Sequence, residues 1–150
     1  MEGGRRASGR EAREGSKGMK QRAASAACPC GGGAYPLCCE RWHRGEAAPS
    51  AVLLMRSRYS AYVLGLDDYL LATWHSRTRP AAHDLQGDEA RWLGLDLQSA
   101  REQGDEATVE FVARYRIAGR AHRLHETSRF LREDGRWFYV DGTFPQGRQP

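Results

Sequence analysis

No cysteine occurs outside residues 28–39 of this 150-residue chain, and lysine ends at Lys20. No stretch approaches the roughly 18 consecutive apolar residues of a membrane-spanning helix. The charged N-terminus also lacks the apolar core of a secretory signal. We therefore expect no membrane contact and a cytoplasmic location. A chain of this length buries about two-thirds of its unfolded surface, so its main body needs no disulfide to fold.

Net positive charge belongs to the N-terminal segment. The formal net charge of the whole chain is +4. Residues 1–27 hold seven basic and three acidic residues, whereas the remainder holds sixteen of each. Residues 1–24 combine glycine, serine and charge without an apolar period, which predicts a disordered basic tail, with Met19 as an alternative initiator. We do not expect nucleic-acid binding beyond this tail.

Apolar residues at steps of three and four predict two helices in the first half of the body. Ser50 suits the N-cap of the first helix, and Gly65 suits its C-terminal end. The expected apolar face of this helix contains Val52, Met55, Tyr59, Tyr62 and Val63. Asp67 is expected to cap a second helix over residues 68–75. Residues 76–90 are polar and predict a loop.

From Arg91 onward the apolar period changes from helical to two, which predicts β-strands. The alternating runs cover residues 91–100, 107–117, 122–131 and 136–144. Turn dipeptides such as Asp134-Gly135 separate these runs at short intervals, as in antiparallel hairpins. Helices followed by an antiparallel meander are typical of an α+β fold.

The cysteines lie within twelve residues, in the pattern C-x-C-x7-C-C, at Cys28, Cys30, Cys38 and Cys39. Four thiolates can surround one tetrahedral Zn²⁺ and leave no position for water, which predicts a structural ion. In a reducing compartment such clusters indicate metal binding more than disulfides. The glycines at 31–33 let the backbone turn around an ion. The alternatives are free or oxidised thiols, or His43 as a ligand in place of a cysteine.

This segment resembles the SEC-C motif, a small zinc-binding element named for the C-terminus of the SecA translocase. The residues that match the motif are Cys28, Pro29, Cys30, Gly31, Gly33, Tyr35, Cys38 and Cys39. Seven residues instead of the usual eight separate the second and third cysteines, and the lysines of the motif are missing. A ribosome-facing or phosphate-facing role of those lysines is therefore not implied for this chain.

The segment "GEAAPSAVLLMRSRYSAYVLGLDDYLLATWH" and the later "SRFLREDGRWFYVDG" are similar to the YchJ-like family of bacterial proteins. The resemblance implies an NTF2-like domain, an α+β cone in which N-terminal helices pack on a curved antiparallel sheet, preceded by a small zinc knuckle. We accordingly expect a tail at 1–24, a SEC-C-like knuckle at 25–45 and an NTF2-like domain at 46–146.

NTF2-like folds often carry a pocket between sheet and helices, and the fold alone does not say whether such a pocket binds or catalyses. The candidate pocket residues are Arg56, Arg58, Tyr59, Trp74, Glu126, Arg129 and Tyr139. Glu126 shares a strand face with Leu124 and Phe130, so we expect it to point inward. A buried carboxylate needs a partner. It can pair with Arg56 or Arg58, bind a ligand, or act as a general base.

Signatures of catalysis are weak in this chain. No Ser/His/Asp or Cys/His spacing stands out, and no phosphate-binding glycine loop is present. His75 is expected at a helix end, and Asp141-Gly142 is expected to end the last strand. We therefore favour a protein-interaction module, whose knuckle presents Tyr35 and Trp42, over an enzyme. The alternative is a small-molecule-binding protein or enzyme that uses the pocket.

Overall fold

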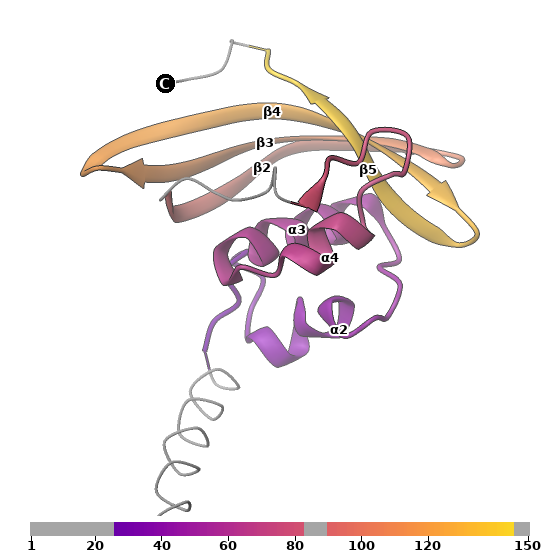
Figure 1. The fold of residues 1–150 in the computed structure, drawn as a ribbon, viewed down its shortest axis with the longest axis horizontal. Helices are drawn as coiled ribbons and strands as arrows, with labels where there is room; N and C mark the ends of the chain where they lie inside the picture. The colour runs from indigo at the N-terminus through magenta and orange to yellow at the C-terminus, as the bar shows by residue number, and fades with distance from the viewer. Residues whose placement is uncertain (1–25, 83–89, 146–150) are drawn as a thin grey trace, which may run out of the picture.

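The computed structural model describes residues 26–82 and 90–145. The predicted tail and part of the predicted loop at 76–90 lie outside the described residues. In chain order the named elements are η1 (Tyr35–Leu37), α2 (Glu40–His43), α3 (Ala51–Leu64), α4 (Asp67–Ala72), β2 (Arg91–Gln103), β3 (Glu106–Ile117), β4 (Arg120–Glu133) and β5 (Arg136–Thr143). A curved sheet lies over α3 and α4, and α2 lies on the side of these helices away from the sheet (Figure 1).

The sheet is an antiparallel meander in the order β2-β3-β4-β5, as the alternating runs predicted. Its hairpins turn at residues 104–105, 118–119 and 134–135, where positive φ angles occur at Gly104, Ala118 and Asp134 among others. The register shifts three times, twice between β2 and β3 and once between Arg129 and Phe130. Such irregularities bend a sheet and increase its twist, which accounts for its curvature around the helices.

One face of the sheet carries the core. Val109, Phe111 and Ala113 of β3 and Phe130 of β4 are buried and belong to one apolar cluster with residues of α3. Glu126 and Ser128 alternate into the same face of β4 and are also buried. The alternation therefore placed a carboxylate among apolar side chains, as expected for Glu126.

Helix α3 is the centre of the molecule. The Oγ of Ser50 accepts a hydrogen bond from the backbone N of Leu53 at 3.1 Å, and Gly65 ends the helix in the left-handed conformation with φ of 74°, so both predicted caps are confirmed. Its buried residues are Ala51, Leu54, Met55, Ser57, Arg58, Tyr59, Ser60 and Ala61. The expected single apolar face was wrong, because Tyr62 is 41% and Val63 38% exposed, and the helix is instead covered on two sides.

Helix α4 is shorter than the predicted helix at 68–75, and Leu66 instead of Asp67 is its N-cap. The chain leaves the helix after Ala72 because residues 73–75 pair with β5. The backbone N of Tyr139 donates to the carbonyl of Thr73 at 2.9 Å, and the N of His75 donates to the carbonyl of Tyr139 at 2.7 Å. Pairing with a strand therefore overrides the helical pattern of this stretch.

The described residues form an α+β fold of the NTF2-like type, with helices packed on a curved antiparallel sheet and a cysteine-rich segment before them. No helix within 26–82 and 90–145 has the length and apolarity to cross a bilayer.

Candidate metal centre and cavity

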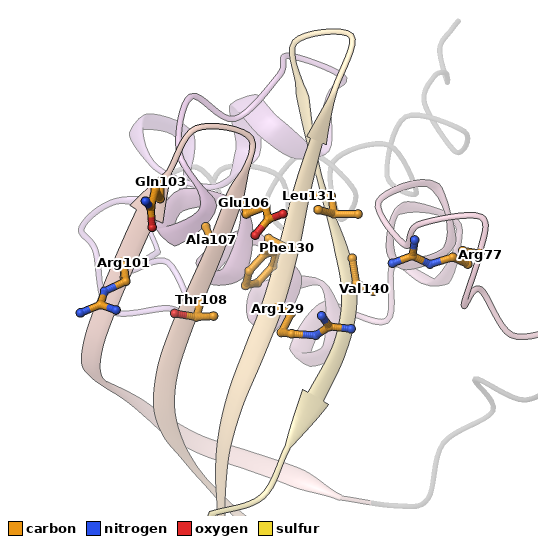
Figure 2. A pocket seen from close by; sticks show the side chains of 10 residues that line it. All are labelled: Arg77, Arg101, Gln103, Glu106, Ala107, Thr108, Arg129, Phe130, Leu131 and Val140. Atoms are coloured by element: carbon orange, nitrogen blue, oxygen red, sulfur yellow. The ribbon is translucent and has the colours of Figure 1, made fainter.

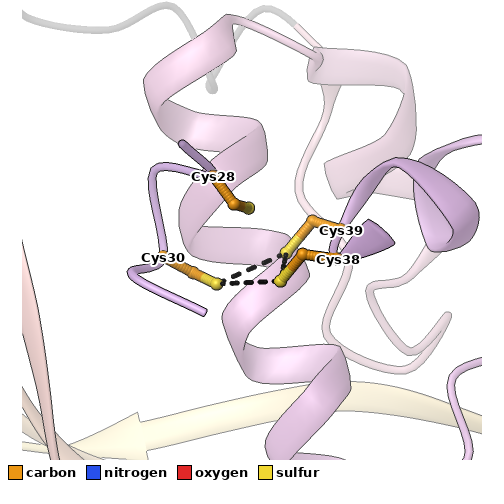
Figure 3. Close-up of side chains that lie close together, drawn as sticks. All are labelled: Cys28, Cys30, Cys38 and Cys39. Carbon is orange, nitrogen blue, oxygen red and sulfur yellow. Dashed lines mark hydrogen bonds between the residues drawn. The ribbon is translucent and has the colours of Figure 1, made fainter. Parts of the chain in front are cut away.

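The four cysteine sulfurs converge on one point (Figure 3). All four Sγ atoms lie within 4.8 Å of one another, and Cys30 lies 3.5 Å from Cys38 and 3.7 Å from Cys39. No disulfide joins them. A tetrahedral Zn²⁺ with Zn–S bonds of about 2.3 Å requires sulfur–sulfur distances of about 3.8 Å. The geometry therefore fits a four-sulfur metal site, as the spacing predicted.

Tight turns in the cysteine loop bring these sulfurs together. The N of Cys28 donates to the carbonyl of Gly33 at 2.6 Å, and Gly33 has a φ of 122°, which favours glycine. At Gly32 a Cβ atom would lie 2.9 Å from the Sγ of Cys38 and 3.3 Å from that of Cys30. The backbone conformation thus explains the glycine at position 33, and the close approach of the sulfurs explains the glycine at position 32.

Side chains of helix α3 hold the cysteine loop in place through hydrogen bonds. The Oγ of Ser60 lies 3.3 Å from the Sγ of Cys28 and donates to the Sγ of Cys39 at 3.4 Å. The Nη1 of Arg56 donates to the carbonyl of Cys30 at 3.0 Å. Sequence reasoning missed Ser60 and assigned Arg56 to the pocket. The available signal was their spacing of four residues, which places two polar groups on one side of a buried helix.

The clustered sulfurs shift the pKa values of one another in opposite directions, and hydrogen bonds from Cys30 and Cys39 lower the pKa of Cys28. Burial, together with the neighbouring sulfur of Cys30, raises the pKa of Cys38 to about 12. The pKa of Cys39 is raised as well, because its thiol hydrogen-bonds to Cys28 and Cys30. Four thiolates at this spacing repel one another unless a cation lies between them, and a dication reverses the preference for the thiol form. The four clustered sulfurs could therefore hold a metal cation, and their chemistry suits one such as Zn²⁺.

His43 is not one of the metal-binding groups, because both of its ring nitrogens are engaged elsewhere. Its Nε2 lies 2.8 Å from the carbonyl oxygen of Ser57, and its Nδ1 lies 2.7 Å from the hydroxyl of Tyr35. A carbonyl only accepts, so Nε2 carries the proton and Nδ1 accepts from Tyr35. Burial lowers the pKa of His43, which keeps the ring neutral. His43 thus ties η1 and α2 to α3.

The surface expected on the knuckle needs correction. Trp42 is 6% exposed and belongs to the apolar core, and Tyr35 is partly buried against His43. The large apolar group that does face solvent is Leu37, which is 83% exposed. Because Cys28, Cys30 and Cys39 share one apolar cluster with α3 and the sheet, the cysteine segment is packed on the domain that follows it.

A cavity of about 280 Å³ lies between α3 and the concave face of the sheet. Of the candidate pocket residues it is lined by Arg58, Tyr59, Trp74, Glu126 and Tyr139. The other lining residues are Met55, Tyr62, Trp92, Phe111, Ala113, Leu124, Ser128, Phe130 and Phe144. The structure therefore brings five candidates together in a space with mostly aromatic walls.

Arg58 is a buried cation in this cavity, 5% exposed. Its Nη1 donates to the carbonyl of Leu70 at 2.8 Å and to the Oγ1 of Thr73 at 2.7 Å. Its guanidinium carbon lies 4.9 Å from the ring centre of Trp74 and 4.6 Å from that of Tyr139. Burial lowers the pKa of Arg58, and the aromatic faces offset part of the lost hydration.

Glu126, 8% exposed, faces the same cavity. Its Oε2 accepts from the Oγ of Ser128 at 2.9 Å and from the hydroxyl of Tyr139 at 3.1 Å. Burial and the neighbouring carboxylate raise the pKa of Tyr139, so its hydroxyl stays protonated as the donor. A Cβ at Gly142 would lie 2.0 Å from Oε2, so the glycine makes room for the carboxylate. Two hydroxyl groups therefore stabilise the carboxylate of Glu126 through hydrogen bonds. It forms no direct ion pair with any of the described residues.

Two candidate residues lie outside the cavity. Arg56 faces the cysteine loop, and Arg129 is on the outer face of the sheet, where it forms a two-pronged ion pair with Asp141. Asp141-Gly142 lies within β5 and is no strand-ending turn. Arg129 lines a hollow of about 370 Å³. Figure 2 shows it there with Thr108, Val140 and Arg77. Because Arg129 and the other charged residues of this hollow are exposed to solvent, the outer hollow lacks the buried charges of the inner cavity.

His75, expected at a helix end, lies after α4 beside β5 and is 8% exposed. Its Nε2 donates to the Oε2 of Glu133 at 2.7 Å, and its Nδ1 accepts from the backbone N of Arg77 at 3.1 Å. The bond from Nε2 joins the chain after α4 to the end of β4, and the bond to Nδ1 fixes the local turn at Arg77. His75 therefore has a structural position and lines none of the cavities described above.

Comparisons with known proteins agree with this architecture. A family model described as the middle NTF2-like domain of YchJ matches residues 50–142. A UPF0225 protein of Chromobacterium violaceum is 56% identical over 133 residues, which cover 84% of this chain and 97% of the relative. Another, from Methylibium petroleiphilum, is 60% identical over 118 residues, which cover 77% of this chain and 86% of the relative.

Solved structures give the same result for the fold. The solution structure of a SEC-C motif-containing protein from Rhodopseudomonas palustris matches with a TM-score of 0.75 and 35% identity, over 79% of this chain and 98% of that chain. The crystal structure of a SEC-C motif-containing protein from Psychrobacter arcticus matches with a TM-score of 0.71 and 24% identity, over 83% of this chain and 85% of that chain. The second likeness supports the fold alone.

Proposed function

This chain belongs to the YchJ family of UPF0225 proteins, and from that membership we propose that it is a cytoplasmic zinc-binding protein-interaction module. Cys28, Cys30, Cys38 and Cys39 would hold one structural Zn²⁺. Four sulfurs fill a tetrahedral coordination sphere, so the ion supplies no open position for chemistry. Its role is to hold the cysteine segment in one conformation. The partner is a protein that binds the segment in this conformation.

The exposure of Leu37 is the observation that carries this proposal. Single exposed leucines are common on protein surfaces and need no special explanation. Leu37, however, directly precedes Cys38 in the short helix η1, so a bound metal holds its backbone in place. Arg56 and Ser60 fix the same loop to α3. An apolar side chain on a backbone that is already held in place loses less conformational entropy on binding than one on a flexible loop, which favours its use as an anchor.

Affinity capture from lysate with three forms of the chain tests the proposal. The forms are the wild type, Leu37→Ser and Cys38→Ser. We expect Leu37→Ser to keep its zinc and lose the partner, and Cys38→Ser to lose both. Capture of the same partner by all three forms would place the interaction on another surface and contradict the proposal.

A second candidate function is supported by a separate observation. The cavity between α3 and the sheet holds the buried charges of Arg58 and Glu126 without a direct ion pair between them. Buried charged groups that only partly satisfy one another are typical of sites that await a ligand. Small-molecule binding in this cavity, with or without catalysis, is therefore the alternative to the protein-interaction role.

A further inference from the structure

We propose that the cavity between α3 and the sheet binds a neutral, planar aromatic molecule that offers a hydrogen-bond acceptor to Arg58 and a donor to Glu126. The proposal rests on the second candidate function described above. It is independent of the zinc-dependent interaction, because the cysteine loop packs on the other side of α3.

Aromatic side chains form most of the cavity wall. They are Tyr59, Tyr62, Trp74, Trp92, Phe111, Phe130, Tyr139 and Phe144. Tyr59 and Trp92 meet edge to face at 5.8 Å, and Trp74 and Tyr139 do so at 5.0 Å. At about 280 Å³ the cavity is near the lower end of small-molecule sites, which span roughly 300–1,000 Å³, so one or two rings fit it. Flat apolar walls of this size favour a planar aromatic ligand.

The polar groups of the cavity have unused hydrogen-bonding capacity. Among the described residues both hydrogen bonds given for Arg58 come from Nη1, and its guanidinium also interacts with the side chain of Tyr62, so N–H donors remain for a bound molecule. Within the part of the chain that the structure describes, both bonds to Glu126 fall on Oε2, so Oε1 is an available acceptor. The indole N–H of Trp74 is buried without a hydrogen-bond partner in the part of the chain that the structure describes. A ligand with one acceptor and one donor would bond to Arg58 and to Glu126 at their unused positions.

The charges of the cavity select against ionised ligands. Arg58 and Glu126 contact opposite parts of Tyr139, the guanidinium over its ring and the carboxylate at its hydroxyl. An anion attracted by Arg58 would therefore lie close to Glu126, and a cation attracted by Glu126 would lie close to Arg58. An uncompensated buried charge is costly, whereas hydrogen bonds from a neutral ligand to both groups are favourable. The pair thus favours a ligand without net charge.

Three probes of nearly equal shape separate these cases: indole-3-carboxamide, which is neutral, indole-3-carboxylate, which is anionic, and indole-3-carboxamidine, which is cationic. Each is titrated calorimetrically into the zinc-loaded full-length chain. We expect the carboxamide to bind at least tenfold more tightly than either charged probe. Its binding should shift the indole N–H resonances of Trp74 and Trp92, which line the cavity.

Glu126→Gln provides a charge-selective control, and Glu110→Gln makes the same change on the outer face of the sheet, where Glu110 bonds to His125. We expect Glu126→Gln to strengthen carboxylate binding about tenfold, and Glu110→Gln to leave all three affinities unchanged.

The proposal is overturned if no probe binds, if a charged probe binds the wild type as tightly as the carboxamide, or if the shifts fall outside the cavity. Should Glu126→Gln not fold, the wild-type comparison alone decides. Partner capture by the same preparations reports separately on the zinc-dependent function.

Discussion

At the scale of single residues, the four cysteines make the most direct prediction. Their sulfurs lie within 4.8 Å of one another and form no disulfide. We expect freshly purified, reduced protein to carry one Zn²⁺ per chain, and Cys28→Ser or Cys39→Ser to lose it. Elemental analysis measures the content, with Leu37→Ser as a surface control that keeps its metal. Wild-type protein without zinc would contradict the assignment.

Gly32 supplies a finer test of the same site. A methyl group at this position would lie 2.9 Å from the Sγ of Cys38, closer than such contacts occur, so Gly32→Ala must push a ligand out of place. We expect the Zn²⁺ affinity, measured by competition with a chelator, to fall about tenfold, as for other changes that misplace metal ligands.

Gly94→Ala is the matched control, because its new methyl group would meet only the mobile end of the Arg114 side chain. We expect it to leave zinc affinity unchanged. An equal loss in both variants would mean that the effect is one of general stability and not of crowding at the sulfurs.

At the scale of elements, the strands were the most predictable part and the helices the least. Alternation identifies strands such as β3 because one face is buried and the other is not. Helix α3 is covered on two sides, so its apolar residues do not form one stripe, and the expected face was wrong at Tyr62 and Val63. Its two faces separate Ser60, which supports the sulfurs, from Arg58, which lines the cavity. The four-residue spacing of Arg56 and Ser60 indicates a shared side of the helix, but it does not say that a cysteine loop covers that side.

The ion pair between Arg129 and Asp141 joins β4 to β5 on the outer face of the sheet. The hydrogen bonds from Arg129 lower the pKa of Asp141 below its usual value. A carboxylate with a lowered folded-state pKa stabilises the fold above the unfolded value of about 3.9 and stops doing so as the pH falls through the folded value. We therefore expect Asp141→Asn to be less stable than the wild type at pH 7, and the difference to shrink as the pH falls below about 4.

Chemical denaturation of both proteins at pH 7 and pH 3 measures this difference, and acid loss of zinc affects the two proteins alike. Asp134→Asn is the control for the change in charge, because Asp134 lies in a hairpin turn where asparagine is equally suited. A difference that is the same at both pH values would show that the ion pair does not contribute.

At the scale of the whole molecule, the basic N-terminal segment should be separable from the fold. Residues 1–18 have no apolar period that could dock on the domain. We expect their removal to leave the melting temperature unchanged and to abolish any affinity for nucleic acid. Calorimetry and a binding assay with a short oligonucleotide check the two parts. A fall of several degrees would show that the segment packs on the body.

The structure changes one expectation more than any other, namely that the cysteine loop is independent of the domain that follows it. Sequence reasoning treated the cysteine loop as an independent knuckle, because residues 28–39 contain few large apolar groups. The structure places Cys28, Cys30 and Trp42 in one apolar cluster with α3. That arrangement depends on contacts such as Ser60 with Cys28 and Arg56 with Cys30, between residues about thirty positions apart. Local sequence patterns do not encode such contacts.

Metal removal should therefore disturb more than the loop and less than the whole domain. Four sulfurs without a cation repel or protonate, so the loop loosens and uncovers one side of α3. The sheet keeps its own hairpin hydrogen bonds and the aromatic side of its core. We expect hydrogen exchange after chelation to show lost protection at residues 28–43, a smaller loss at Arg56–Ala61, and unchanged protection in β3 and β4. Loss confined to 28–43 would restore the independent knuckle, whereas loss across the strands would make the zinc site part of a single cooperative core.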